Sequence, residues 1–243
     1  PTVLLDENGY ALMTQEDIDM VTVLDFGWSQ YNIPSLSGIE YFTNLESLTC
    51  SDTGLALCDL SKNTKLKNAN IQMNQMQSLD FSHCPDLHTL VCSYNQYLVN
   101  LNLENCTKLS NLQAQSTGLT TLVIPNPSAM DNFLYGGTTL SYDLSLFTNL
   151  TGLGLMDMNL KNLDIIPSQI KAQLNNLFVD NNQLTSFDFT EYPNLSYLHI
   201  AYNNLTSLDL SSIKNPSEYK DLICNDNLMT SLDITPLTNL ERI

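Results

Sequence analysis

His199 is the residue of this chain whose type and setting are best suited to chemistry. The repeating pattern described below sets it on the open face of a strand, with Asp180 and Asp221 on neighbouring strands. A histidine between two carboxylates could act as a general acid or base, or it could bind a metal ion. Because a metal site usually has a third or fourth firm ligand, we expect a surface histidine here. A hydrolase or metal site around His199 stays an alternative.

The other reactive residue types lie outside the settings that catalysis requires. His83 falls in a turn and His88 at the start of a strand. The chain has no glycine-rich phosphate loop, no Cys-x-x-Cys pair and no serine in a strand-to-helix elbow. We therefore predict a non-enzymatic protein that uses no cofactor and no metal ion.

The segment DENGYALMTQED, residues 6–17, resembles a calcium-binding loop in part. The residues that match ligand places of such a loop are Asp6, Asn8, Thr14 and Asp17. Tyr10 stands where the loop needs another oxygen ligand, and Ala11 stands where it needs glycine for a sharp turn. We prefer a short cap helix that begins near Thr14, with Glu16 and Asp17 in its first turn.

The frame that positions all of these residues is a repeat. Two stretches, NNQLTSFDFTEY from Asn181 and YNNLTSLDLSSI from Tyr202, are nearly the same and lie 21 residues apart. An apolar residue opens a Leu-x-x-Leu-x-apolar phrase every 20 to 24 residues, at Leu45, Leu66, Leu87, Leu109, Met130, Leu150, Leu174, Leu195, Tyr219 and Leu240. One such unit cannot close a core alone, whereas stacked units bury a continuous one, so the repeat predicts a solenoid.

Each repeat contains a strand with one buried face. The last three residues of the phrase alternate between core and outside, which is the period of a β-strand, and stacking the repeats makes a parallel sheet. An asparagine three residues later fits a buried ladder that satisfies backbone groups of the turns: Asn74, Asn95, Asn182, Asn203 and Asn227. The phrase that follows, LTSLDLS in residues 205–211, is too short for a helix, so we expect an extended or 3₁₀ convex side.

Aspartates and cysteines also follow the repeat. The convex phrase carries an aspartate, which we expect to cap turn N–H groups, at Asp59, Asp80, Asp164, Asp188, Asp209 and Asp233. The cysteines occupy core slots or matching turns: Cys50, Cys58, Cys84, Cys92, Cys106 and Cys224. We predict that all six are free and buried, although Cys84 and Cys106 lie in adjacent coils and could pair.

The slot that faces outward between the paired strand leucines changes character along the chain. It is mostly polar in the first half and mostly apolar in the second: Thr49, Asn70, Val91, Gln113, Leu134, Gly154, Phe178, His199 and Ile223. Exposed apolar and aromatic side chains mark contact sites. We predict a partner-binding surface made of Leu134, Met156, Phe178, Tyr197, His199, Tyr202 and Ile223. Four glycines should leave a dent beside it: Gly136, Gly137, Gly152 and Gly154.

A glycan-binding module is the alternative use of this face. The aromatic side chains that could stack on sugar rings are Tyr94, Phe178, Tyr197 and Tyr202. A glycan array and a protein pull-down would separate the two functions.

The net charge narrows the choice of partner. The chain has 9 lysines and arginines against 26 aspartates and glutamates, a formal charge of −17. Nucleic acids and anionic membranes are bound through lysine and arginine, so we expect neither as a partner. The chain has no apolar run long enough to cross a membrane, and its first residues lack the pattern of a signal peptide.

The repeat phrase matches the leucine-rich-repeat pattern, and LSYLHIAYNNL, residues 195–205, shows it nearly whole. With PNLSYL, TNLTGL, and the calcium-loop-like cap followed by GIEYFTNLESL, it resembles bacterial surface leucine-rich-repeat proteins. The resemblance is to the short-repeat, internalin-like group found in gut Bacteroidetes. It implies an α/β solenoid, a right-handed superhelix with a concave parallel sheet. It also implies a secreted or cell-surface-anchored protein whose concave face holds a host or bacterial protein partner.

The unbroken period predicts one elongated body without a linker. Residues 1–42 are interpreted as an N-terminal cap with a degenerate first coil, in which Trp28 and Phe42 help to close the core. Residues 43–243 are interpreted as about nine coils and a truncated last one, continuous with the cap. The pattern is irregular at residues 125–143 and at the two 24-residue steps, so we expect those coils to bulge.

Overall fold

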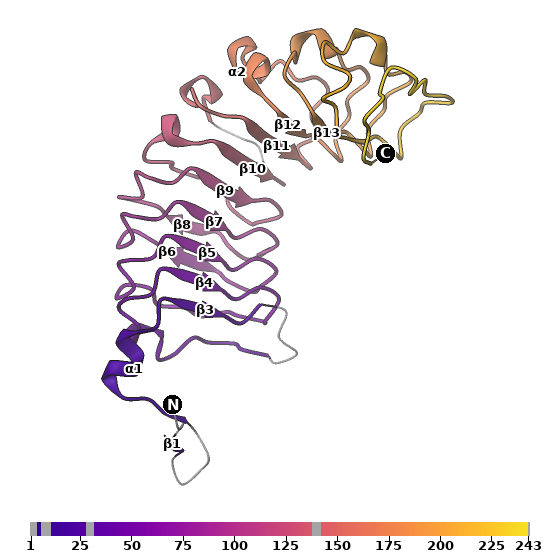
Figure 1. Cartoon of the computed structure of the whole chain (residues 1–243). Coiled ribbons are helices and arrows are strands. Elements are labelled where there is room, and N and C mark those ends of the chain that lie inside the picture. The colour runs from indigo at the N-terminus through magenta and orange to yellow at the C-terminus, as the bar shows by residue number, and fades with distance from the viewer. Residues whose placement is uncertain (1–3, 6–10, 28–31, 138–141, 243) are drawn as a thin grey trace.

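The computed structural model describes residues 4–5, 11–27, 32–137 and 142–242. These residues form a stack of coils whose concave side is lined by one ten-stranded parallel sheet (Figure 1). Its strands follow one another in chain order, as the leucine-rich-repeat solenoid predicted from the sequence requires. The prediction of a leucine-rich-repeat solenoid is confirmed. No helix in the described part of the chain is long and apolar enough to span a membrane.

Each coil contributes one short strand to the concave sheet. The strands are β3 (Val23–Asp25), β4 (Ser47–Thr49), β5 (Asn68–Asn70), β7 (Thr89–Val91), β9 (Asn111–Ala114), β10 (Asn132–Gly136), β11 (Gly152–Met156), β12 (Asn176–Phe178), β13 (Tyr197–His199) and β14 (Asp221–Ile223). The second residue of each strand from β4 onward points into the core, and register is kept through β10 despite the irregular sequence around it. Alternation then fixes which residues face outward.

Asparagine side chains tie each coil to the one before it. Asn203 donates to the carbonyls of Val179 (3.0 Å), Ile200 (3.1 Å) and Ala201 (3.0 Å) and accepts from Leu184 N (2.9 Å). The other asparagines with this arrangement are Asn74, Asn95, Asn182 and Asn227. Each one satisfies buried backbone groups that the parallel sheet leaves open.

The residue before each of these asparagines has a left-handed backbone. Tyr202 has a φ of 53° and Tyr94 a φ of 58°, values that non-glycine residues rarely adopt. The turn is held by the ladder asparagine that follows, which bonds the carbonyls around it. A consequence is that the side chain at this place projects away from the coil, and both tyrosines are exposed.

The convex side changes along the solenoid. In the first half it is extended and includes a two-stranded parallel sheet of β6 (Ser78–Asp80) and β8 (Asn100–Asn102). Short helical segments occur mainly in the second half: η1 (Ile39–Tyr41), η2 (Pro127–Ala129), η3 (Leu144–Leu146), α2 (Ser168–Gln173), η4 (Phe189–Glu191) and η5 (Leu210–Ser212). A helix is wider than the spacing of two strands, so the helical half is longer on its outside. Figure 1 shows the stack nearly straight up to β9 and bending from β10 onward.

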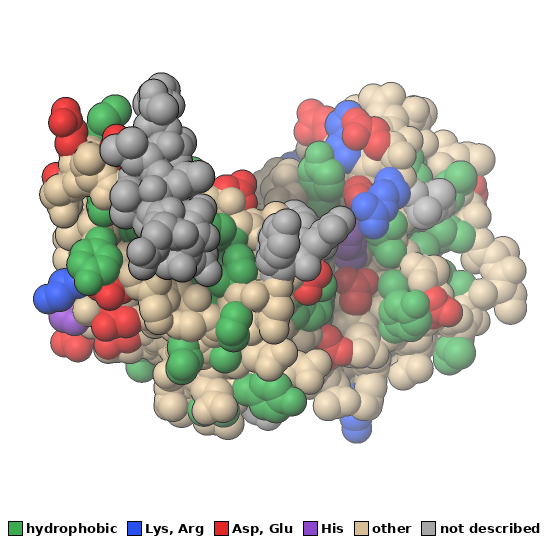
Figure 2. Space-filling model, turned by 90° about the horizontal axis from the view of Figure 1, so that it is seen from below, with side chains coloured by type: hydrophobic (Ala, Val, Ile, Leu, Met, Phe, Trp, Pro, Cys, Tyr) green, Lys and Arg blue, Asp and Glu red, His purple; other side chains and the backbone are tan. Residues whose placement is uncertain are grey.

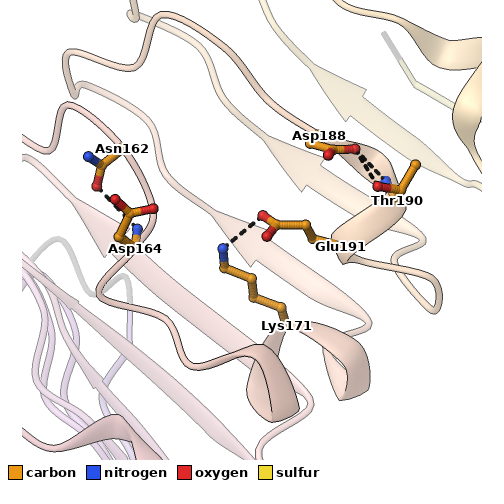
Figure 3. A network of polar contacts seen from close by, with 6 residues as sticks. All are labelled: Asn162, Asp164, Lys171, Asp188, Thr190 and Glu191. Atoms are coloured by element: carbon orange, nitrogen blue, oxygen red, sulfur yellow. Dashed lines mark hydrogen bonds and ion pairs between the residues drawn. The ribbon is translucent and has the colours of Figure 1, made fainter.

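The longer step before Leu174 is explained by α2, the one α-helix on the described convex side. Lys171 on this helix is buried, and its Nζ lies 2.8 Å from Glu191 Oε2 (Figure 3). The same Nζ lies 5.7 Å from the centre of the Tyr192 ring. The ion pair connects α2 to η4 in the following coil. The bulge expected from the sequence is thus a short helix that is tied into the stack.

Aspartates cap the convex turns in most coils. Asp188 Oδ1 accepts from Thr190 N at 2.9 Å (Figure 3), and the same contact with the residue two further on occurs at Asp59, Asp80, Asp209 and Asp233. Asp143 also makes it, although the sequence did not suggest it. Asp164 is the exception, because its own N–H donates to Asn162 Oδ1 (Figure 3). Capping was therefore predicted correctly at five places and wrongly at Asp164.

These hydrogen bonds act on the ionisation of the capping carboxyls. Bonds from Ser61, Ser82, Ser145, Thr190 and Thr235 lower the pKa of Asp59, Asp80, Asp143, Asp188 and Asp233 below the ordinary value of 3.8. A lowered pKa in the folded state means that the stabilisation is present above the ordinary value and is lost as the pH falls from that value through the lowered pKa of the folded state. The convex turns should loosen together in acid.

The N-terminal cap contains the short helix expected from the sequence. A hairpin of β1 (Leu4–Leu5) and β2 (Ala11–Leu12) precedes α1 (Gln15–Asp19). Thr14 Oγ1 accepts from Asp17 N (3.1 Å) and Asp17 Oδ2 accepts from Thr14 N (2.9 Å), which is a capping box. Thr14 and Asp17, two of the four residues that match the calcium-loop pattern, therefore form the N-terminal cap of this helix. Asp6, Asn8, Tyr10 and Trp28 lie outside the described residues, and Phe42 packs partly buried against the core.

The cysteines are free thiols. Cys50, Cys84, Cys92 and Cys106 are buried as predicted, whereas Cys58 and Cys224 are only partly buried because they lie near the edge of the core. Burial raises the pKa of Cys84 to about 11 and the pKa of Cys58, Cys92 and Cys106 to about 12. The reactive thiolate is therefore scarce at neutral pH.

We expect a thiol reagent at neutral pH to titrate close to none of the cysteines in the folded protein. After denaturation without reductant it should titrate all six. Within the slow reaction of the folded state, Cys58 and Cys224 should react first because they are partly exposed. A total of four or fewer after denaturation would mean that a disulfide exists.

Candidate functional site

The outward-facing middle row of the concave sheet brings the predicted residues into line. Strand register places Leu134 beside Gly154, Gly154 beside Phe178, Phe178 beside His199 and His199 beside Ile223. The side chains of this row are half-buried by their neighbours, while Tyr197 and Tyr202 are 37% and 57% exposed. Figure 2 shows hydrophobic and acidic side chains around the hollow of the molecule, seen from the N-terminal end.

His199 is held between an aromatic ring and a carboxylate. Its ring meets that of Phe178 edge to face, with centroids 4.7 Å apart, and its Nε2 lies 3.5 Å from Asp221 Oδ2. Arg242 reaches the same oxygen from the next coil, with Nη1 at 3.8 Å. Asp221 pairs in register with Tyr197 on one side and bridges to Arg242 on the other.

One carboxylate oxygen of this cluster, Asp221 Oδ1, is buried and accepts no hydrogen bond from a described residue. The other oxygen of the same carboxylate, Oδ2, is shared by His199 and Arg242. A buried acceptor without a donor costs free energy.

Asp180 lies beside the row at the exit of β12. Burial raises the pKa of Asp180 above its ordinary value, and a hydrogen bond from Ala201 N (2.8 Å) and the nearby His199 act in the opposite direction. Asp180 is therefore positioned by the backbone of the next coil, and its contact with His199 is electrostatic. The sequence placed Asp180 on the neighbouring strand, whereas the structure places it two residues after that strand ends.

The cluster around His199 is formed with the side chains of Phe178, Asp221 and Arg242. The described residues contain no group of three or more histidine, cysteine, aspartate or glutamate side chains that could hold a metal ion. His199 contacts the ring of Phe178 and the carboxylate of Asp221, and Ile223 lies beside it in the sheet register. On the outward face the arrangement presents an apolar ring, an imidazole and an aliphatic side chain, at Phe178, His199 and Ile223.

The glycines do not form the dent that the sequence suggested. Gly136, Gly152 and Gly154 are buried, because neighbouring groups lie over them. A methyl group on Gly154 would lie 2.9 Å from Leu134 Cδ2 and 3.2 Å from Met156 Cε, so these two side chains fill the space above it. Leu134 and Met156 therefore form an apolar floor between the polar half of the sheet and Phe178.

Two features of this face were missed from the sequence. Arg242 belongs to the site, and aligning the last repeat with its predecessor could have found it, since it follows Leu240 as Asp221 follows Tyr219. A groove of about 470 Å³ also lies at the edge of the polar half and is lined by Asp52, Met73, Gln75, Tyr94, Gln96 and Tyr97, among others. The sequence feature that could have indicated this groove is the position before each ladder asparagine. The backbone there is left-handed, so the side chain projects outward.

The aromatic residues proposed for sugar stacking do not form one site. Tyr202 follows β13 and Phe178 ends β12, close to Tyr197, but Tyr94 follows β7. Strands β9, β10, β11 and β12 separate β7 from β13 in the sheet. A single sugar chain would have to cross four strands to contact all four residues, so Tyr94 belongs to the other groove.

Comparison of structures finds proteins that are similar to this chain. No protein-family model matches the sequence, and no curated protein matches it. The functional domain of InlJ from Listeria monocytogenes superposes with a TM-score of 0.70 and 23% identity, over 94% of this chain and 49% of that one. An internalin, inlF, from the same organism superposes with a TM-score of 0.51 and 20% sequence identity, over 95% of this chain and 88% of that one. This chain thus spans about half of the InlJ chain.

A plant protein is similar at the same level. The leucine-rich-repeat ectodomain of the receptor kinase GASSHO1/SCHENGEN3 from Arabidopsis thaliana, in complex with CASPARIAN STRIP INTEGRITY FACTOR 2, gives a TM-score of 0.53 and 20% identity. The match covers 93% of this chain and 32% of that one. Identities this low carry the fold alone. The chain has the leucine-rich-repeat fold.

Proposed function

We propose that this chain is a non-enzymatic binding module that holds a protein partner on the second half of its concave face. The binding surface consists of Leu134, Met156, Phe178, Tyr197, His199, Tyr202 and Ile223. We further propose that the protein acts outside the cell, secreted or anchored at a bacterial surface, as its sequence resemblance to bacterial surface leucine-rich-repeat proteins implies. Its partner is a host or bacterial protein.

The observation that carries the proposal is the register of the middle row. Phe178, His199 and Ile223 lie side by side on three strands, and the Nε2 of His199 lies 3.5 Å from Asp221 Oδ2. The same row in the first half presents Thr49 and Asn70. Aromatic and aliphatic anchors beside a polar group are typical of the centre of a protein interface.

The neighbours support a protein partner in general. Solenoids of this kind use their concave surfaces for binding, and the plant ectodomain was solved with a partner bound. The acidic character of the chain, with a formal charge of −17, favours a neutral or basic partner.

The test compares the two halves of the sheet. Phe178→Ala and Ile223→Ala should each weaken binding about thirtyfold or more, because a central anchor contributes about 2 kcal/mol. Thr49→Ala and Asn70→Ala are the matched controls and should change the dissociation constant less than about threefold. The partner is first isolated by pull-down, and binding is then measured by calorimetry. Equal losses in both halves would move the site elsewhere.

A glycan-binding function is the second candidate, and the groove around Tyr94 favours it. The groove combines the exposed rings of Tyr94 and Tyr97 with Asp52, Gln75 and Gln96. Rings and carboxylate or amide groups together are what a sugar needs for stacking and hydrogen bonding. Binding on a glycan array that Tyr94→Ala abolishes and Phe178→Ala leaves intact would assign this function to the groove.

A further inference from the structure

The small sheet on the convex side has a free edge. Strands β6 and β8 pair with each other, and in the described part of the chain β8 pairs with no other strand. Phe81 N donates to Asn102 O (2.9 Å), so the carbonyl of Asn102 faces β6. Backbone groups of successive residues point to opposite edges of a strand, so the N–H and C=O of Leu101 face away from β6. Leu103 N, one coil on from Phe81 N, donates to no described residue.

The next coil is close to β8 at one end and held away from it at the other. At Gly118 the two coils nearly touch, since a methyl group there would lie 2.8 Å from Gln96 O. Further along, Tyr142 Oη accepts from Ile124 N (2.7 Å) and donates to Ile124 O (3.3 Å). The segment that could have become the third strand is thereby tied to the following coil. Pro125 lacks the N–H that would continue a strand.

A groove of about 730 Å³ lies where the sheet stops. Its walls are formed by β6, β8 and the segment from Thr121 to Pro125. Val99 and Val123 in these walls are 49% and 74% exposed. Exposed β-branched side chains beside a free strand edge are the features that a further strand would cover.

The charge of the groove indicates what could add to this edge. Asp80 and Glu104 line it, together with Ser78, Asn100, Asn102 and Asn105, and none of the described lining residues is basic. A second copy of this chain, with a formal charge of −17, would be repelled. A segment that carries lysine or arginine on its outer face and small apolar residues on its inner face would complement the groove.

We propose that this convex groove binds an extended, basic peptide segment of a protein partner, which adds to the free edge of β8 as a third strand. Main-chain hydrogen bonds to Leu101 and Leu103 supply the affinity, and Asp80 and Glu104 select for basic residues. The site lies on the opposite side of the coils from the concave face and is independent of the function proposed above.

The test uses a fluorescein-labelled nine-residue peptide of alternating lysine and valine, with binding measured by anisotropy. N-methylation of either the lysine amides or the valine amides removes donors from one edge of the peptide only. We expect one of the two methylated peptides to bind about tenfold more weakly or worse, and the other to bind within about twofold of the parent. Equal binding by both, or equal loss in both, would overturn the strand-addition model.

Protein variants locate the site. Asp80→Asn together with Glu104→Gln should weaken binding at least about threefold, and the asparagine keeps the cap on Ser82 N. Glu16→Gln together with Glu218→Gln changes the net charge equally at exposed places and should have little effect. Phe178→Ala should also leave binding unchanged. If the control pair weakens binding as much as the Asp80 and Glu104 pair, or if Phe178→Ala abolishes it, the groove is not the site. Self-association of the chain without peptide binding would assign the edge to a second copy and refute the proposal.

Discussion

Asn203→Ala should lower the melting temperature far more than Asn204→Ala. The Asn203 side chain makes four hydrogen bonds to backbone groups of two coils and is buried. Each buried backbone group left without a partner costs about 1–3 kcal/mol, so the free energy of unfolding should fall by at least about 3 kcal/mol. In a chain of this length that corresponds to a drop of roughly 10 °C.

Asn204 is the matched control because it is the same residue one place further on. It is exposed, and its contact with the preceding coil is made by its backbone N–H to Leu184 O, which alanine keeps. Thermal unfolding followed by circular dichroism measures both variants. Melting temperatures within about 2 °C of each other would show that the ladder does not hold the coils together.

The fold could be predicted from the sequence because its determining features are periodic. Leu177 and Leu198 occupy the same place in successive repeats, and each lies in the core at the centre of its strand. The same alignment placed Phe178 and His199 side by side on the outside. Periodicity fixes position along and across the sheet, which is why the register survived even at β10, where the sequence is irregular.

The features that the repeat period could not predict depend on contacts of individual side chains. The dent at Gly154 is filled by Leu134 and Met156, a contact decided by side-chain length. Asp164 is not a cap because Asn162 bonds to its N–H instead. The free edge of β8 exists because Tyr142 holds Ile124 in the following coil. Each departure comes from one specific side-chain contact, and a repeat pattern contains no information about such contacts.

Leu177→Ala should destabilise the protein strongly, whereas Phe178→Ala, one residue further, should not. Leu177 is fully buried and lies between Leu153 and Leu198 in the sheet register. Truncation of Leu177 to alanine leaves a cavity between the flanking leucines of the neighbouring coils. Such a change lowers the free energy of unfolding by about 2–5 kcal/mol. Phe178 faces outward, and its removal loses mainly the ring contact with His199, about 1 kcal/mol.

Urea denaturation of the two variants measures this difference directly. Leu177→Ala should shift the midpoint to lower urea without a change in slope, because the surface exposed on unfolding stays nearly the same. Leu153→Ala serves as a positive control, since it truncates the equivalent leucine one coil earlier. Equal destabilisation by Phe178→Ala and Leu177→Ala would mean that Phe178 packs inward. The strand register would then be wrong by one residue, and every side chain assigned to the concave face would belong to the core.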